Sequence, residues 1–524
     1  MSIVSFTFGI FLFVFGILYY IVPKKIQWGI LLCGNLVFYA YSGPRNLIYI
    51  LSCALFIWLS AIGIENLSSE QKNKIAEADD KDKKAALRRL YGKRKKILVA
   101  VTLLLTLGVW IVLKYGPFLT DSFADVFHFP ELKGTLKFIV PLGISFYTFD
   151  AVGYLIDVYR GKYGAEHNYF RFLTFLSYFP HIIQGPFSRF HTLGRALFEE
   201  HSLSYDRLCQ GLSRMLWGYF KKLIIADKLG IAVNEIFAHY ESYWGFQILC
   251  VIILYGIQIY ADFSGYMDIV CGISRVLGID LDENFRQPYF SRSVEEFWRR
   301  WHMTLGHWFR DYLFYPISMS GKVQQISRYF RMRFNPRAGK LAVSFIAMFW
   351  VWSATGLWHG ANWTFLVWGW LNMIVMMAGQ ALEPYYEKCR KFLHISLNNR
   401  FYDLFRIVRT FGLICFFRFF SRADSLHTAI EMLKKIFSGF NRKLLLTPLK
   451  FFPQLQPRDV WIVAVGVTMM LAVDVISEIG MWERFKEKTP FPVRDLVYIF
   501  MIFAIILFAG TGTDISTNFI YANF

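Results

Sequence analysis

A long stretch without formal charge constrains this chain most. From Leu341 to Leu382 the sequence contains no Asp, Glu, Lys or Arg. Apolar segments of about 20 residues, the length that crosses a bilayer as a helix, recur elsewhere along the chain. Charged residues make up 18% of the 524 residues, below the roughly 25% that is usual in soluble domains. The sequence therefore predicts an all-α, polytopic membrane protein.

The apolar segments predict about eleven to thirteen membrane helices. The candidates are residues 3–22, 28–41, 47–64, 97–113, 138–155, 208–233, 246–277, 341–358, 363–382, 405–420, 460–476 and 497–510. A shorter apolar run, 169–183, is interrupted by Pro180, which favours a re-entrant or interfacial segment. Because there is no repeat of 20–50 residues, we expect residues 1–524 to form a single membrane-embedded domain.

Basic loops predict the orientation in the membrane. Residues 67–96 hold eleven Lys or Arg against five acidic residues, which predicts a basic, partly helical cytoplasmic loop. Residues 292–340 hold ten against three and fall on the same side, as a basic re-entrant or interfacial segment. Residues 421–458 are also basic, yet the same counting of crossings places them outside. The net charge of +19 follows from such loops, and we expect no nucleic-acid partner because no binding module accompanies it.

His359 is the one side chain of the charge-free stretch that titrates near neutral pH. An ionisable group in an apolar span is costly and is by default a candidate functional residue. Gly356 and Gly360 flank it, and tryptophans lie nearby, which favours a shaped site. A buried histidine that only bonds a neighbour on a packed helix is the alternative.

A second concentrated region covers residues 295–312. At helical spacing one face carries four apolar side chains, Trp298, Trp301, Leu305 and Trp308. His302 lies beside that face, with Arg299 about one turn earlier. The pattern predicts an amphipathic helix at the membrane interface or at a polar cavity. The alternative is an interfacial anchor whose arginines contact lipid phosphates.

Several kinds of site are not indicated. His302 and His307 are five residues apart and point to different faces of a helix, and the HExxH motif is absent, so we expect no metal. The sequence has no G-x-S-x-G, P-loop or dinucleotide fingerprint. The seven cysteines are scattered without CxxC and are expected to be small apolar packing residues. We expect no permanently bound cofactor.

Two carboxylates, Asp262 and Asp268, lie within an apolar segment. Intramembrane carboxylates pair with a cation or line a wet cavity. We expect both to be structural, with Arg275, Arg299 and Arg310 as candidate partners.

The two histidine regions together suggest acyl transfer. His359 would deprotonate a hydroxyl inside the membrane, and His302 with the arginine-rich stretch would face a cytoplasmic, anionic thioester. Candidates for donor or substrate binding are Arg299, Arg310, Asp311, Asn362 and Trp363.

Several long segments resemble, in the right order, the membrane-bound O-acyltransferase (MBOAT) family in its bacterial alginate O-acetyltransferase branch. The matching segments are residues 140–149, 178–186, 261–268, 296–302, 308–313, 356–360 and 419–426. The resemblance implies a ring of tilted helices around a funnel, with His359 as the essential intramembrane histidine and His302 as the second polar position at the narrow point.

The resemblance also implies the substrates. The donor would be a cytoplasmic acyl-CoA or acyl-carrier-protein thioester, and the acyl group an acetyl group. The acceptor would be a hydroxyl of a secreted polysaccharide or of an extracytoplasmic, acyltransferase- or esterase-like partner that works with polysaccharide export machinery. The location would be the bacterial cytoplasmic membrane.

One residue departs from the alginate branch. Asn372 stands where that branch usually carries a further histidine, and asparagine does not titrate near neutrality. The alternative within the family is D-alanyl transfer toward teichoic acid. From another class, a polysaccharide-linked transporter or flippase predicts inverted repeats in the two halves, which the sequence does not show.

Overall fold

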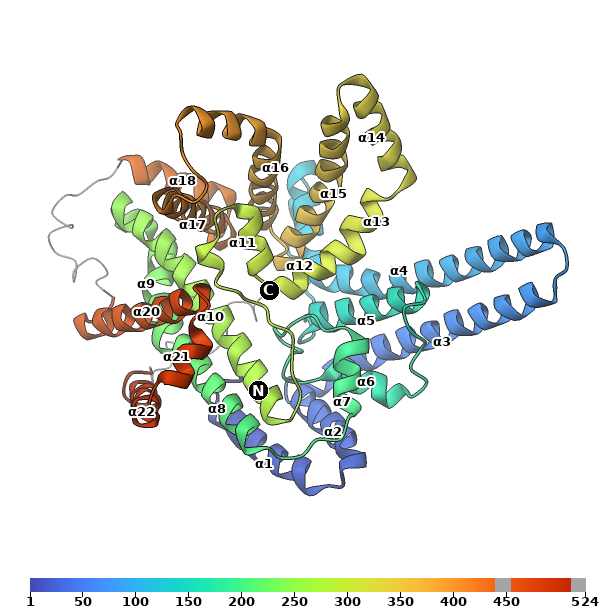
Figure 1. Cartoon of the computed structure of the whole chain (residues 1–524), viewed down its shortest axis with the longest axis horizontal. Helices are drawn as coiled ribbons and strands as arrows, with labels where there is room; N and C mark the ends of the chain where they lie inside the picture. The colour runs from blue at the N-terminus through green and yellow to red at the C-terminus, as the bar shows by residue number, and fades with distance from the viewer. Residues whose placement is uncertain (439–453, 510–524) are drawn as a thin grey trace. The chain divides into compact units, whose positions relative to one another are not determined.

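The computed structural model describes residues 1–438 and 454–509 (Figure 1). These residues form helices and connecting loops, and their only β-type pairing is the isolated bridge between Phe285 and Trp301. Two compact units are present. Unit 1 comprises residues 1–212 and 270–282, and unit 2 comprises 213–269 and 283–524. The all-α prediction is confirmed, and the single-domain, ring and funnel descriptions stay predictions.

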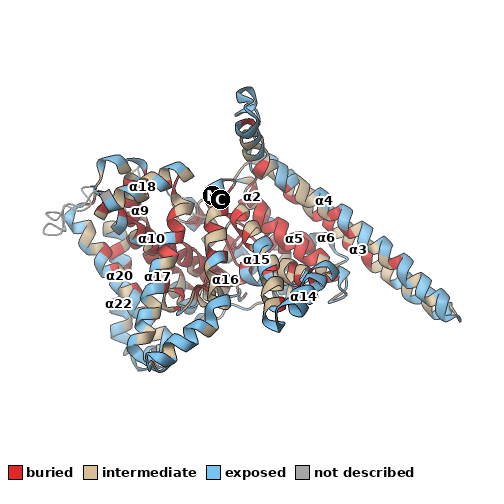
Figure 2. Cartoon of the chain, turned by 90° about the horizontal axis from the view of Figure 1, so that it is seen from above, coloured by how far each residue is buried: buried red, intermediate tan, exposed pale blue. Residues whose placement is uncertain are grey.

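Unit 1 contains two long helices, α3 and α4, that lie side by side and extend beyond its other helices (Figure 1). Its helices are α1 (Phe6–Ile21), α2 (Gln27–Ala40), α3 (Leu47–Glu77), α4 (Lys81–Phe127), α5 (Ile144–Tyr159), α6 (Tyr169–Ser177) and α7 (Arg195–Phe198), with the first part of α8 (Tyr205–Phe220). Helix α5 packs against α3, α4 and α6 and is buried along almost its whole length (Figure 2). Helix α6 ends at Ser177, before Pro180, as the proline predicts.

Unit 2 holds both candidate histidines. Its helices are α9 (Asp227–Ala238), most of α10 (Gly245–Val276), α11 (Val294–Arg300), α12 (Met303–Phe309), α13 (Tyr315–Ser318), α14 (Gly321–Arg333), α15 (Pro336–His359), α16 (Trp363–Phe392), α17 (Arg400–Arg422), α18 (Leu426–Ser438), α20 (Pro457–Glu478), α21 (Trp482–Lys488) and α22 (Phe491–Phe508). Helices α15 and α16 pack against each other as a hairpin (Figure 1). The side chains of Asn335 and Asn362 accept backbone N–H groups and start the two helices.

Seven helices among the described residues are long and apolar enough to cross a membrane. They lie at Pro44–Glu77, Lys81–Phe127, Gly245–Val276, Pro336–His359, Trp363–Phe392, Pro457–Glu478 and Phe491–Phe508. A shorter apolar helix covers Phe6–Ile21. The chain is therefore a multi-pass membrane protein. Several further candidate segments lie in helices that are shorter or less apolar, including α2, α5 and α17.

The structure extends one expectation about the basic regions and corrects another. Residues 67–96, expected to be partly helical, are almost entirely helical, because α3 and α4 continue through them and only 78–80 intervene. The aromatic segment 295–312 is not one amphipathic helix, since α11 and α12 are separated at Trp301 and His302. Part of the basic region 421–458 lies outside the described residues. Residue 510, the last of the final candidate span, also lies outside them.

Candidate functional site

His359 is the last residue of α15 and is 4% exposed. The hairpin that holds it is close-packed at glycines. A Cβ at Gly356 would lie 2.6 Å from the carbonyl oxygen of Phe365, and a Cβ at Gly369 would lie 2.6 Å from the carbonyl oxygen of Trp352. Any larger residue would separate the two helices, so the glycines bring α16 against the end of α15. The flanking glycines thus mark a close approach, as the sequence indicated.

His302 stands at the break between α11 and α12 with φ 47° and ψ 52°. A non-glycine residue in the left-handed region is uncommon and persists only where its surroundings impose it. Here the loop before α11 imposes it. Met303 N donates to Asn284 O at 3.1 Å, Arg286 N donates to Arg300 O at 3.0 Å, and Phe285 bridges to Trp301.

The side chain of Asn284 fixes the imidazole of His302. Its Oδ1 lies 3.3 Å from His302 Nδ1 and also accepts the amide and the hydroxyl of Thr304, at 3.1 and 2.7 Å. Since Oδ1 is an acceptor, His302 carries its proton on Nδ1, and Nε2 keeps a lone pair. Burial lowers the pKa of His302, so the ring is neutral near pH 7. Nothing in the sequence pattern singled out Asn284, which lies 18 residues from His302.

One tryptophan contacts both histidines. The centroid of Trp358 lies 5.9 Å from that of His302 and 4.9 Å from that of His359. The ring of His359 also packs in a T-shaped arrangement with that of Trp368, with centroids 4.9 Å apart and an interplanar angle of 85°. The structure therefore brings the two predicted catalytic histidines into one buried aromatic cluster of unit 2.

Asn372, the departure from the alginate branch, belongs to the same cluster. Its Oδ1 accepts Trp298 Nε1 at 2.9 Å, and its Nδ2 donates to Trp368 O at 2.8 Å. Trp298 in turn packs edge-to-face on Trp352 and Trp368. The buried side chain of Asn372 therefore links the indole of Trp298 to the backbone carbonyl of Trp368 through two hydrogen bonds.

The predicted donor-binding residues are not gathered at the histidines. Arg299 forms an ion pair with Glu295 and its side chain is 67% exposed. The other four candidates either bond to residues close by in sequence or are exposed; they are Arg310, Asp311, Asn362 and Trp363. Arg310 pairs with Asp311 at 3.1 Å, and Asn362 caps α16 while its Nδ2 donates to Asp424 O. Their role in donor binding stays a prediction.

Asp262 and Asp268 pair with lysines and not with the expected arginines of positions 275, 299 and 310. Asp262 lies 2.8 Å from Lys222, and Asp268 lies 2.7 Å from Lys221 and 2.9 Å from Arg214. Both lysines belong to η5 (Lys221–Ala226), a π-helical turn after α8. Sequence reasoning missed the lysines, although two adjacent cations inside an apolar run were the available signal.

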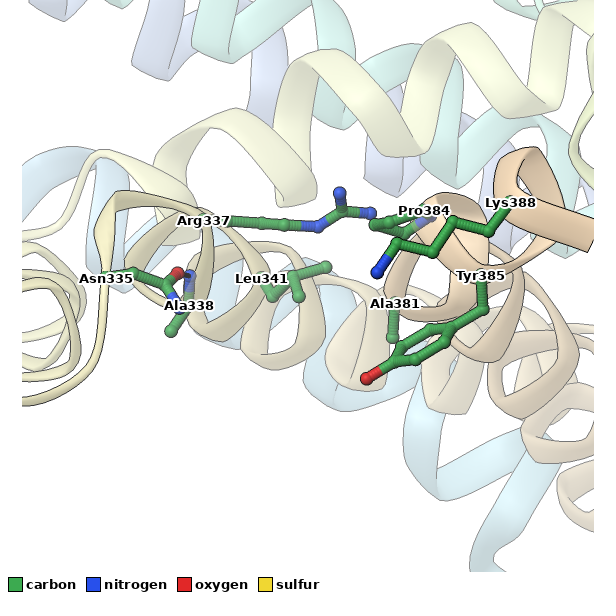
Figure 3. Close-up of a pocket in the computed structure, with 8 residues that line it drawn as sticks. All are labelled: Asn335, Arg337, Ala338, Leu341, Ala381, Pro384, Tyr385 and Lys388. Atoms are coloured by element: carbon green, nitrogen blue, oxygen red, sulfur yellow. Dashed lines mark hydrogen bonds between the residues drawn. The ribbon is translucent and has the colours of Figure 1, made fainter. Parts of the chain in front are cut away.

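A cavity of about 310 Å³ lies elsewhere on the same hairpin, between the start of α15 and the second half of α16 (Figure 3). The side chains of Arg337, Lys388 and Tyr385 border it, together with the apolar side chains of Leu341 and Ala381. Because an α-helix rises about 1.5 Å per residue, this cavity is about 30 Å along α15 from its last residue. It is therefore separate from the histidine cluster.

The part of the chain that holds this cluster matches a known protein family. The model of the membrane-bound O-acyltransferase family matches residues 162–408, which include both histidines. A probable alginate O-acetylase, AlgI, of Pseudomonas aeruginosa is 32% identical over 82% of this chain and 73% of its own length. The peptidoglycan O-acetyltransferase of Helicobacter pylori is 28% identical over 65% of this chain and 64% of its own.

A third relative represents a different acyl group. The teichoic acid D-alanyltransferase of Bacillus subtilis is 30% identical over 52% of this chain and 67% of its own length. The family match, the extent of these similarities and the apolar helices lead to one conclusion. The chain belongs to the membrane-bound O-acyltransferase family and is a multi-pass O-acyltransferase.

Proposed function

We propose that this protein transfers an acetyl group from a cytoplasmic thioester, acetyl-CoA or an acyl-carrier protein, to a hydroxyl on the outer side of a bacterial cytoplasmic membrane. The hydroxyl belongs to a secreted polysaccharide or to an extracytoplasmic acyl-carrying partner of the export machinery. The observation that carries the proposal is the contact of Trp358 with both buried imidazoles. Similarity to alginate and peptidoglycan acetylating proteins over most of the chain supports acetyl as the group transferred.

The reaction needs one base. The acceptor hydroxyl gives its proton to the imidazole of His359 while its oxygen forms a bond to the thioester carbon, and the carbonyl electrons move to oxygen. The tetrahedral species then collapses, the C–S bond breaks, and the thiolate takes the proton from the imidazolium. The products are an O-acyl ester and a free thiol, and His359 returns to its neutral form.

Helix ends distinguish the two histidines. His359 ends the 24-residue helix α15, where the partial negative charge of the C-terminus stabilises an imidazolium. His302 lies between the C-terminal end of α11 and the N-terminal end of α12, so the partial charges of the two helix ends oppose each other there. The hydrogen bond to Asn284 leaves His302 Nε2 as an acceptor, so in its neutral form His302 orients a hydroxyl and does not donate to the thioester carbonyl.

The experiment uses the purified protein with labelled acetyl-CoA and an oligosaccharide acceptor. His359→Asn should reduce acylation by about 10²–10⁴-fold, the usual contribution of a positioned base. His302→Asn should keep measurable activity, because an amide oxygen can still accept a hydrogen bond. His307→Asn, on the exposed side of α12, is the matched control and should resemble the wild type. Full activity of His359→Asn would end the assignment of the base.

D-alanyl transfer is the second candidate, supported by the similarity to the teichoic acid enzyme over about half of the chain. Replacing acetyl-CoA by a D-alanyl thioester of a carrier protein in the same assay separates the two. Transfer of D-alanine but not of acetate would favour this candidate over the first.

A further inference from the structure

Arg418 on α17 is a buried cation next to the histidine cluster. It is 2% exposed, and its guanidinium carbon lies 3.8 Å from the ring centroid of Trp301, the residue that precedes His302. Phe297 stacks on the same indole at 5.5 Å and 19° and lies 5.7 Å from the guanidinium. Arg418 is thus held among aromatic rings within unit 2.

Three buried nitrogen atoms of this stack lack acceptors. Among the side chains that the structure describes, neither Nε nor Nη2 of Arg418 has a hydrogen-bond partner, and neither does the indole Nε1 of Trp301. No carboxylate among those described side chains is in ion-pair contact with Arg418. Cation–π attraction offsets only part of the cost of burying such a charge. The free-energy cost of burying these N–H groups and this charge is offset when an anion forms or binds nearby.

Acyl transfer supplies such an anion. Negative charge appears first on the thioester carbonyl oxygen, as the C–O bond forms, and then on sulfur, as the C–S bond breaks. We propose that the Arg418–Trp301 stack is the positively charged element that stabilises these two anions. Arg418 acts through Trp301 and is therefore a positioning residue. Fixed charge of this kind is most effective in a buried, low-dielectric site. The inference rests on the proposed acyl transfer.

The test compares three variants in the acetyl-transfer assay, with thermal unfolding measured in parallel. Arg418→Met keeps the apolar stem and removes the charge, whereas Arg418→Lys keeps the charge. Arg422→Met is the matched control. Arg422 lies one turn further along α17 and also stacks on a ring, that of Phe237 at 5.1 Å, but its Nη2 donates to Asn234.

The expected result is a loss of turnover without a loss of stability. Arg418→Met should lower kcat by about 10- to 100-fold, with the donor KM within about threefold of the wild-type value. Its Tm should be unchanged or higher, because an uncompensated buried charge has been removed. Arg418→Lys should recover most of kcat, and Arg422→Met should leave kcat within about twofold.

Contrary results have distinct meanings. Wild-type kcat in Arg418→Met would overturn the inference and leave acyl transfer standing. A lower Tm, or failure of the protein to accumulate, would make Arg418 a packing residue, and failure of lysine to restore kcat would exclude a role for the charge. An inactive wild-type protein would overturn the proposed function together with this inference.

Discussion

Replacing Asn284 with alanine would test the framework that holds His302 in place. The Oδ1 atom of Asn284 accepts the Thr304 amide at 3.1 Å, the Thr304 hydroxyl at 2.7 Å and His302 Nδ1 at 3.3 Å. All three residues are buried. Alanine therefore removes one acceptor from three donors that have little access to water.

The magnitude follows from those three donors. A buried donor left without its acceptor costs about 1–3 kcal/mol. The hydroxyl of Thr304 can rotate, and the imidazole of His302 can move its proton to Nε2, so the full cost applies mainly to the backbone amide. We expect Asn284→Ala to lower the free energy of unfolding by about 2–4 kcal/mol. Turnover should fall at least about 10-fold, because the tautomer and orientation of His302 are no longer fixed.

The assay measures unfolding by denaturant in detergent micelles, together with acetyl transfer. Thr304→Val is the comparison, since it removes one donor and leaves Asn284 with the other two. It should cost about 0.5–1.5 kcal/mol. The double variant should cost less than the sum of the single variants by about 1 kcal/mol, because both remove the same hydrogen bond.

Two results would contradict this reasoning. Stability of Asn284→Ala within about 0.5 kcal/mol of the wild type would show that the side chain does not support the loop. Strict additivity of the two substitutions would show that Asn284 and Thr304 act independently, despite their 2.7 Å contact.

Three further predictions concern the titration of His302, the close packing of the hairpin and the membrane topology. Because burial lowers the pKa of His302, below about pH 6.5 the unfolded chain binds a proton that the folded chain does not, so stability should fall by up to about 1.4 kcal/mol per pH unit toward the lowered pKa. Thermal unfolding at pH 7, 6 and 5 should show a steeper loss for the wild type than for His302→Asn, and equal losses would refute the assignment. Gly356→Ala, whose Cβ would lie 2.6 Å from Phe365 O, should cost about 1–3 kcal/mol in thermal unfolding. Gly379→Ala on α16, which has open space around it, should be neutral or slightly stabilising, and the reverse order would contradict the close approach. Lys83→Cys, exposed near the start of α4, should react with an impermeant maleimide only after the cells are opened, whereas labelling of intact cells would invert the predicted topology.

The apolar helices α15 and α16 and the buried position of His359 could be predicted because their signals are local. A helix crosses a bilayer when its own residues are apolar, so α15 and α16 are visible in the charge-free stretch itself. An imidazole in such a stretch stands out against its immediate neighbours. The glycines around His359 indicated close packing for the same reason, because only a missing side chain lets two backbones approach.

The environment of His302 could not be predicted, because residues distant in sequence impose it. Helical periodicity in residues 295–312 is real, and it indicated one helix. The backbone instead breaks at His302, where hydrogen bonds from the 284–286 segment compete successfully with helical ones. Tertiary contacts of this kind override local propensity. The error in the partners of Asp262 and Asp268 has a similar cause, since the lysines of η5 reach α10 from 40 or more residues away.

Asn372 shows how a departure from a family pattern can be reconciled with the same packing. Its amide accepts the indole N–H of Trp298 and donates to the carbonyl of Trp368 at the same time. A neutral imidazole also has one acceptor and one donor nitrogen, so either side chain can satisfy the two tryptophans. What asparagine removes is a second group able to take up a proton beside His359, which itself lies 4.9 Å from Trp368. The chain therefore keeps the aromatic support of the base and leaves His359 as the titratable member of that pair of positions.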